Sequence, residues 1–158
     1  MANVSRVFGF RPIRHLHGAA WNGQTTKYYV TSANATALGI GDLVSLDGGS
    51  DGGAVRSVVR TAVNGVSVGP IVSVAVRPSA GLDSPQYVPA STGMYVYVCD
   101  DPTVLFECQE DAVGGALASN SVGLNANITI AAASTVTGLS AMQLDTSTAD
   151  MTNTLRLR

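Results

Sequence analysis

Short runs of apolar residues alternate along the chain with clusters of turn-forming residues. The clearest run covers 93–99, in which Met94, Val96 and Val98 alternate with two tyrosines and a cysteine. A period of two places successive side chains on opposite faces of a β-strand. Because both faces of this run are apolar or aromatic, we expect a strand that is buried on both sides.

Further strands are expected where β-branched and aromatic residues gather between turn signals. These runs cover 27–31, 43–46, 54–61, 66–76, 103–108, 128–132, 142–144 and 154–158. Within 66–76, the side chains of Val72, Val74 and Val76 are expected to share one face. Helical periodicity is nearly absent, and at most one helical turn is expected, near 116–117.

Glycine, asparagine, aspartate and proline mark the turns between these runs. The segment 47–53 contains four glycines and two aspartates, which predicts a flexible hairpin loop. It lacks the closing glutamate of an EF-hand calcium loop. Asn64-Gly65 predicts a tight hairpin, and 100–102 predicts a turn. Residues 77–92 contain three prolines and predict a long connection.

The pattern as a whole predicts an all-β fold: a jelly roll, or a β-barrel or sandwich of about eight to ten short strands. At 158 residues the chain suits one compact domain, with or without arms. We expect a single domain over 27–158 and an extended N-terminal arm over 1–26. The apolar residues of this arm follow neither the strand nor the helix period. Two alternatives remain open for it: a strap across another surface, or a segment folded onto its own domain.

The composition indicates a surface that other molecules cover. Charged residues make up only 13% of the chain, and Lys27 is its single lysine. This is about half of the usual charged share of a globular domain, so we expect part of the surface to lie against partners in an assembly. A monomer with a serine- and threonine-rich surface is the alternative.

Charge is unevenly distributed along the chain. The net charge of −2 gives no support for nucleic-acid binding. The first 41 residues contain only basic charges, at positions 6, 11, 14 and 27, whereas five acids gather within 100–111. The basic and the acidic segments are candidates for pairing between subunits, and two solvated faces are the alternative.

Catalytic and metal-binding patterns are sparse. In a strand, His15 and His17 would point to one side, as zinc ligands do, but no further ligand is signalled, so we interpret them as polar or interface residues. Asp100 and Asp101, beside Pro102, are typical of a turn rather than of paired glycosidase acids. Nucleophile-elbow, phosphate-loop and metalloprotease motifs are absent from the sequence. We therefore predict no enzyme, no cofactor and no metal site.

The two cysteines, Cys99 and Cys108, are too few for a disulfide framework. We expect free thiols, kept reduced in a cytoplasm, although a pair facing across the turn at 100–102 is the alternative. The start of the sequence lacks the apolar segment of a secretory signal, and no run of about 20 apolar residues predicts a membrane span.

Several motifs of the chain resemble those of a group of tailed-phage virion proteins, the capsid cement (decoration) proteins. The motifs are Phe8-Gly-Phe-Arg-Pro12, Gly18-Ala-Ala-Trp-Asn-Gly23, Lys27-Tyr-Tyr-Val30, Asp100-Asp-Pro-Thr-Val-Leu-Phe-Glu107, Gln109-Glu-Asp111 and Val122-Gly-Leu-Asn125. The resemblance implies a β-barrel or jelly-roll body, self-association as a homodimer or homotrimer, and straps across the major capsid protein. It also implies a location on the outer capsid surface of a virion, after synthesis in the cytoplasm of a host bacterium.

Within this interpretation, the arm supplies the expected contacts with the capsid. Aromatic anchors and arginines are the side chains most often found at binding hot spots. The candidate contact residues are Arg6, Phe8, Phe10, Arg11, Arg14 and Trp21.

Two rival functions are a tail or receptor-binding virion component and, less in keeping with the motifs, a small β-fold hydrolase. The alternating run at 155–158 ends without a turn or polar tail, and the resembling proteins continue past such a strand. We therefore hypothesise that a further C-terminal segment follows, and a terminal strand donated to a sheet is the alternative.

Overall fold

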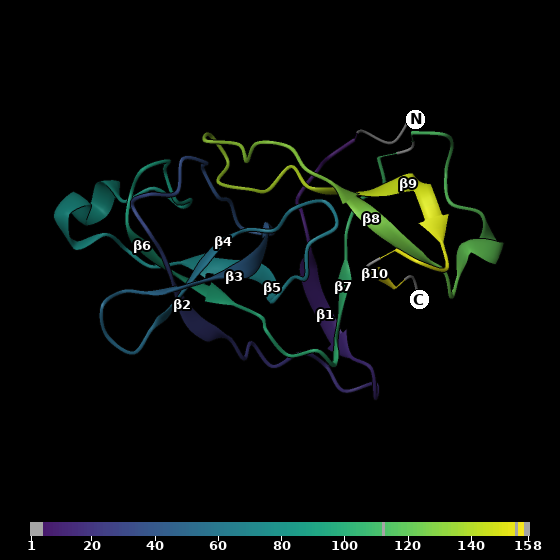
Figure 1. The fold of residues 1–158 in the computed structure, drawn as a ribbon, viewed down its shortest axis with the longest axis horizontal. Coiled ribbons are helices and arrows are strands. Elements are labelled where there is room, and N and C mark those ends of the chain that lie inside the picture. Colours follow the sequence, from purple (N-terminus) through teal and green to yellow (C-terminus); the bar gives the residue numbers. More distant parts are fainter. Residues whose placement is uncertain (1–4, 112, 154, 157–158) are drawn as a thin grey trace.

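The computed structural model describes residues 5–111, 113–153 and 155–156, and it confirms the predicted all-β fold (Figure 1). Its strands are β1 (Arg11–His15), β2 (Thr26–Val30), β3 (Leu43–Ser50), β4 (Arg56–Arg60), β5 (Gly69–Val74), β6 (Met94–Val98), β7 (Val104–Glu107), β8 (Asn125–Thr129), β9 (Gln143–Asp150) and β10 (Leu155–Arg156). Two short 3-10 segments, η1 (Pro78–Asp83) and η2 (Ser119–Ser121), interrupt the connections.

Five of these strands form a closed barrel in the order β2-β4-β3-β5-β6. Neighbouring strands are antiparallel, except that β2 runs parallel to β4. Of the predicted architectures, the barrel is the one these strands form, whereas a jelly roll is not confirmed. Closure removes the free edges of this sheet, which is how a small β-domain avoids unpaired strands.

The barrel is filled by the alternating apolar residues of its strands. Val96 and Val98 in β6 are fully buried, as are Val30, Val44 and Val58 from β2, β3 and β4. On the outer face of β6 the two tyrosines are only half-buried. The prediction of a strand buried on both sides is therefore correct for the inner face and too strong for the outer one.

The expected hairpin at Asn64-Gly65 does not form between its flanking strands. The turn itself exists, since the Gly65 amide donates to the Ala62 carbonyl at 2.9 Å. However, β4 and β5 lie on opposite sides of β3, so the connection crosses the end of β3 instead. The Val68 amide bonds to the Val44 carbonyl there, at 2.8 Å.

The expectation that Val72, Val74 and Val76 share a face is wrong. The pairing of β5 with β6 shifts register between Ile71 and Ser73, and a β-bulge of this kind changes which residues face inward. Ile71 is buried and Val74 packs against the barrel core, while Val76 lies beyond β5 and is 70% exposed.

Two smaller sheets lie beside the barrel: the β1–β7 ribbon and a sheet in the order β10-β8-β9 (Figure 1). A second core joins them to the barrel, where Phe10, Leu43, Ile128 and Met142 pack together. β8 and β9 begin at or near the predicted positions, but β9 extends through a polar stretch to Asp150. The described chain has two 3-10 segments where at most one helical turn was expected: η1 lies in the connection at 77–92, and η2 lies at 119–121 rather than at 116–117.

The expected arm, residues 1–26, is in contact with the rest of the chain over much of its described length. β1 pairs with β7, and the Phe10 amide donates to the Gly41 carbonyl at 2.9 Å. Gly9 has a positive φ of 74°, and an added Cβ there would lie 2.5 Å from the Gly41 carbonyl oxygen. Glycine therefore permits the close approach that buries Phe10. Residues 1–4 of the arm lie outside the described part, as do 154, 157 and 158 of the last predicted strand.

Candidate functional site

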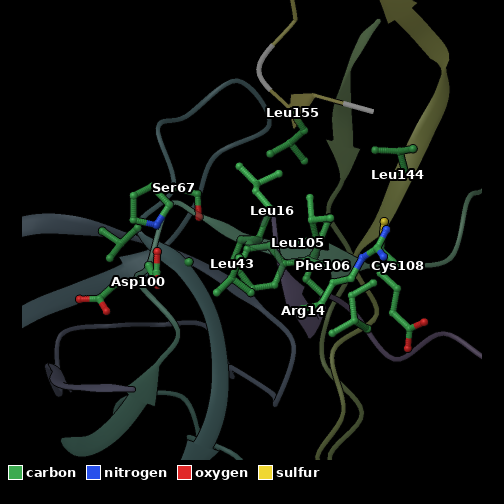
Figure 2. Close-up of a pocket in the computed structure, with 18 of the residues that line it drawn as sticks. Arg14, Leu16, Leu43, Ser67, Asp100, Leu105, Phe106, Cys108, Leu144 and Leu155 are labelled. Atoms are coloured by element: carbon green, nitrogen blue, oxygen red, sulfur yellow. The ribbon is translucent and has the colours of Figure 1, made fainter. Parts of the chain in front are cut away.

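An open groove of about 960 Å³ lies where the barrel, the β1–β7 ribbon and the β8–β10 sheet meet. Figure 2 shows Leu16, Leu43 and Leu105 gathered at its centre, with Leu155 approaching from the other side. The large apolar residues that line it are Phe10, Ile13, Leu16, Leu43, Leu46, Val68, Val104, Leu105, Phe106, Leu144 and Leu155. Four parts of the fold that are distant in sequence thus supply one apolar surface.

Several of these apolar side chains are exposed to solvent. Ile13 is 44% exposed, Leu46 is 47% exposed and Leu16 is 37% exposed. Single exposed apolar residues are common, but a contiguous apolar surface is typical of a site that binds another molecule. Each square ångström of apolar surface covered there contributes about 25 cal/mol to binding before the costs of association.

The acidic side chains of the groove are already engaged by the chain itself. Asp100 accepts hydrogen bonds from the Thr26 and Tyr28 hydroxyls at 3.0 and 2.9 Å. Asp101 accepts from the Thr103 hydroxyl and amide at 2.7 and 2.8 Å, and these bonds hold its pKa below the ordinary value. These bonds leave both aspartates with fewer free acceptor sites for a partner.

Glu107, the third acid of the groove, forms an ion pair with Arg11. The guanidinium of Arg11 also lies over the Phe8 ring, 5.3 Å from its centroid. Of the three residues, only Glu107 lines the groove. The Arg11 charge is therefore compensated within the β1–β7 ribbon.

The two arginines of the groove, Arg14 and Arg56, are exposed. Neither guanidinium forms an ion pair or a side-chain hydrogen bond with any residue that the structure describes. An arginine without an acid partner retains all five N–H donors for a carboxylate. The groove thus combines an apolar floor with two available cations.

The structure places the six predicted contact residues in different environments. Arg14 lines the groove, whereas Arg11 of β1 lies over the ring of Phe8, which precedes this strand. Arg6 is exposed and its amide donates to Gln109 at 3.1 Å. Phe10 is buried in the second core, only 7% exposed, so its ring serves the chain's own packing. Phe10 also lines the groove, so its contact with a partner stays a prediction.

Trp21 is half-buried, and its indole N–H is buried without a hydrogen-bond partner in the described part of the chain. It lies close to Cys99 and does not line the groove. A buried indole N–H is a cost to the fold unless an acceptor lies near it, and the Cys99 sulfur, a weak acceptor, lies beside it.

Sequence reasoning missed Leu46, Arg56 and Leu105 as site residues. Leu105 carries a local signal, because the run at 103–108 has apolar residues on both faces. Leu46 and Arg56 have no such local sequence signal, because their proximity to β7 depends on how the barrel packs beside the β1–β7 ribbon.

The other candidates from the sequence do not assemble into a site. In the part of the chain that the structure describes, no three His, Cys, Asp or Glu side chains come close enough to hold a metal ion. His15 lies 3.2 Å from the Thr103 hydroxyl through its Nδ1. The predicted hairpin loop at 47–53 is shorter than expected, because β3 continues to Ser50. Asp47 and Asp51 accept hydrogen bonds from the amides of Gly49 and Gly53, at 2.9 and 2.8 Å.

Both cysteines are free thiols in this structure. Burial raises the pKa of Cys99 and raises the pKa of Cys108 to about 11. A thiol is a nucleophile or metal ligand only as its thiolate, so these environments disfavour reactivity at either residue.

Comparisons with known proteins give no match: none of the family models, curated proteins or solved structures that were searched resembles the chain. Among the described residues, no helix is long and apolar enough to cross a membrane. The resemblance to capsid cement proteins therefore stays a prediction.

Proposed function

We propose that this chain is a structural binding protein, an outer cement subunit of a tailed-phage capsid, and that the apolar groove is its main contact surface. The observation that carries the proposal is the combination of exposed apolar side chains, Ile13, Leu16 and Leu46, with two available arginines. This surface is open and mixed in character, which suits a protein partner better than a small substrate that must be enclosed.

The physical role follows from the position of a cement subunit. A shell that holds packaged DNA is under outward pressure, and a subunit that straddles neighbouring capsid proteins adds buried area across their seam. At about 25 cal/mol per Å² of apolar area, small contacts repeated over a shell raise the barrier to rupture. The expected partners are the major capsid protein and other copies of this chain.

The low charge of the chain is consistent with this role. Charged residues are 13% of the sequence, and protein interfaces are depleted of lysine and acids at their centres. The basic residues before position 42, three of which are arginines, can donate hydrogen bonds to acidic or polar groups at the rim of such an interface.

Sedimentation with phage heads tests the proposal. The wild-type chain should sediment with expanded heads that lack their cement protein, and Leu16→Asp should reduce its occupancy at least about tenfold, since a charge in an apolar contact is costly. Val136→Asp is the matched control, because Val136 is 93% exposed and lies outside the groove. Equal occupancy for wild type and Leu16→Asp, or no binding of wild type to the heads, would contradict the proposal.

A further inference from the structure

Two strands that line the groove have an open edge. β7 has β1 as its only strand neighbour, and β10 has only β8, among the described residues. Apart from the ladder with β1, the backbone groups of Leu105 and Phe106 form no hydrogen bond with the described part of the chain. An open strand edge presents unpaired N–H and C=O groups and is a template for another strand.

The groove follows the length of β7 rather than one of its faces. All four residues of this strand, 104–107, line it. Successive side chains of a strand point to opposite faces, so a cavity that touches each of them in turn runs beside the strand. Leu155, from β10, lies across the same groove (Figure 2). A segment lying here would therefore contact apolar side chains of β7 on one side and Leu155 on the other.

The charges of the groove specify the partner further. Its acids, Asp100, Asp101 and Glu107, bond within the chain, whereas Arg14 and Arg56 have no acidic partner among the described residues. An incoming segment therefore meets an apolar floor and two cations with free donors.

We propose that the groove accepts an extended segment of a partner protein, which adds a strand to the open edge of β7 and places a carboxylate against Arg14 or Arg56. The segment carries apolar side chains at alternate positions, as strand addition requires. This inference rests on the proposed function, because it takes the groove to be the partner-binding surface, and it specifies the chemistry of what binds there.

Peptide selection against the full-length chain tests this inference. Immobilised protein is offered a library of random peptides of about nine residues, which span one strand. The selected peptides should alternate apolar residues with Asp or Glu. N-methylation of alternate peptide amides should abolish binding, because strand addition depends on backbone hydrogen bonds. The inference would be overturned if no peptide is selected, if the selected peptides lack acids, or if their binding survives N-methylation.

Charge reversal provides the second measurement, by fluorescence anisotropy of the best labelled peptide. Arg14→Glu and Arg56→Glu should together weaken binding at least about tenfold, and Asp or Glu→Lys in the peptide should restore affinity for the variants. Lys27→Glu is the matched control, because Lys27 is exposed but does not line the groove. An equal loss in this control would overturn the specific role of the two arginines. Thermal unfolding of each variant shows that the fold is intact.

The two proposals fail separately. If the chain binds phage heads through the groove but selects no acidic strand, the strand inference is wrong and the cement function stands. If it selects the acidic strand but does not bind heads, the strand inference stands and the cement function is wrong.

Discussion

The Ser140 hydroxyl donates a hydrogen bond to the buried carboxylate of Asp42. This bond joins the segment before β9 to the turn that leads into β3. Asp42 is fully buried and also accepts from the Gly39 amide at 2.7 Å, while the Ser140 oxygen accepts from the Met142 amide at 3.0 Å. Leu43, the residue after Asp42, lines the groove. The junction between the barrel and the second core is therefore polar and specific, and it lies next to the groove in the sequence.

Removing the Ser140 hydroxyl should destabilise this junction. Ser140→Ala leaves the buried Asp42 carboxylate with one donor fewer, which costs about 1–3 kcal/mol of unfolding free energy. Urea denaturation measures the change. Ser32→Ala is the control, because Ser32 is exposed, and its effect should stay within about 0.5 kcal/mol. Similar small effects in both variants would show that the Ser140–Asp42 bond does not hold the junction.

The same carboxylate should make stability depend on pH. Burial raises the pKa of Asp42 above its ordinary value of 3.8, although the bonds from Ser140 and Gly39 oppose the shift. The folded state therefore holds this proton more tightly than the unfolded state. The stabilisation is fully present below pH 3.8 and is lost as the pH rises through the folded pKa.

Comparison with Asp42→Asn isolates this contribution from other groups, such as Asp101 and Asp111, whose pKa values are lowered and which act in the opposite direction. The unfolding free energy of wild type relative to Asp42→Asn should fall as the pH rises above 3.8. Urea denaturation across acidic pH measures the difference. A difference that is constant or that grows with pH would contradict the raised pKa.

Phe10 and Phe8, two residues apart, should differ sharply in their effect on stability. Phe10 is in the second core, 7% exposed, so Phe10→Ala should cost about 3–5 kcal/mol. Phe8 is half-buried beside Arg11, and Phe8→Ala should cost about 1 kcal/mol or less. Thermal or urea unfolding of both variants tests this. Equal, small losses would indicate that the N-terminal segment is a free arm after all.

These residues also show what the sequence can and cannot reveal about the fold. The alternation in β6 is local, so its inner face was predictable from the order of Met94, Val96 and Val98. The bulge in β5 was not, because it arises from the pairing of Ile71 and Ser73 with β6. Similarly, a turn at Asn64-Gly65 is local information, whereas the crossing over β3 depends on strand order.

The groove was predictable only in part. Arg14 was expected as a contact because arginines and aromatic residues gather near the N-terminus. Arg56 and Leu46 come from the β3–β4 hairpin, and only the packing of the barrel beside the ribbon brings them to the same surface. The burial of Phe10 in the second core was not predictable, because an apolar residue in an irregular segment gives the same sequence signal whether it anchors a partner or fills its own core.

A particle reconstruction tests the central claim most directly. Electron cryomicroscopy of tailed-phage virions that contain this chain should place it on the outer capsid surface, with the groove of Ile13, Leu16 and Leu46 covered by the major capsid protein or by a neighbouring copy. Density for the chain in the tail, or on the shell with this groove open to solvent, would contradict the account.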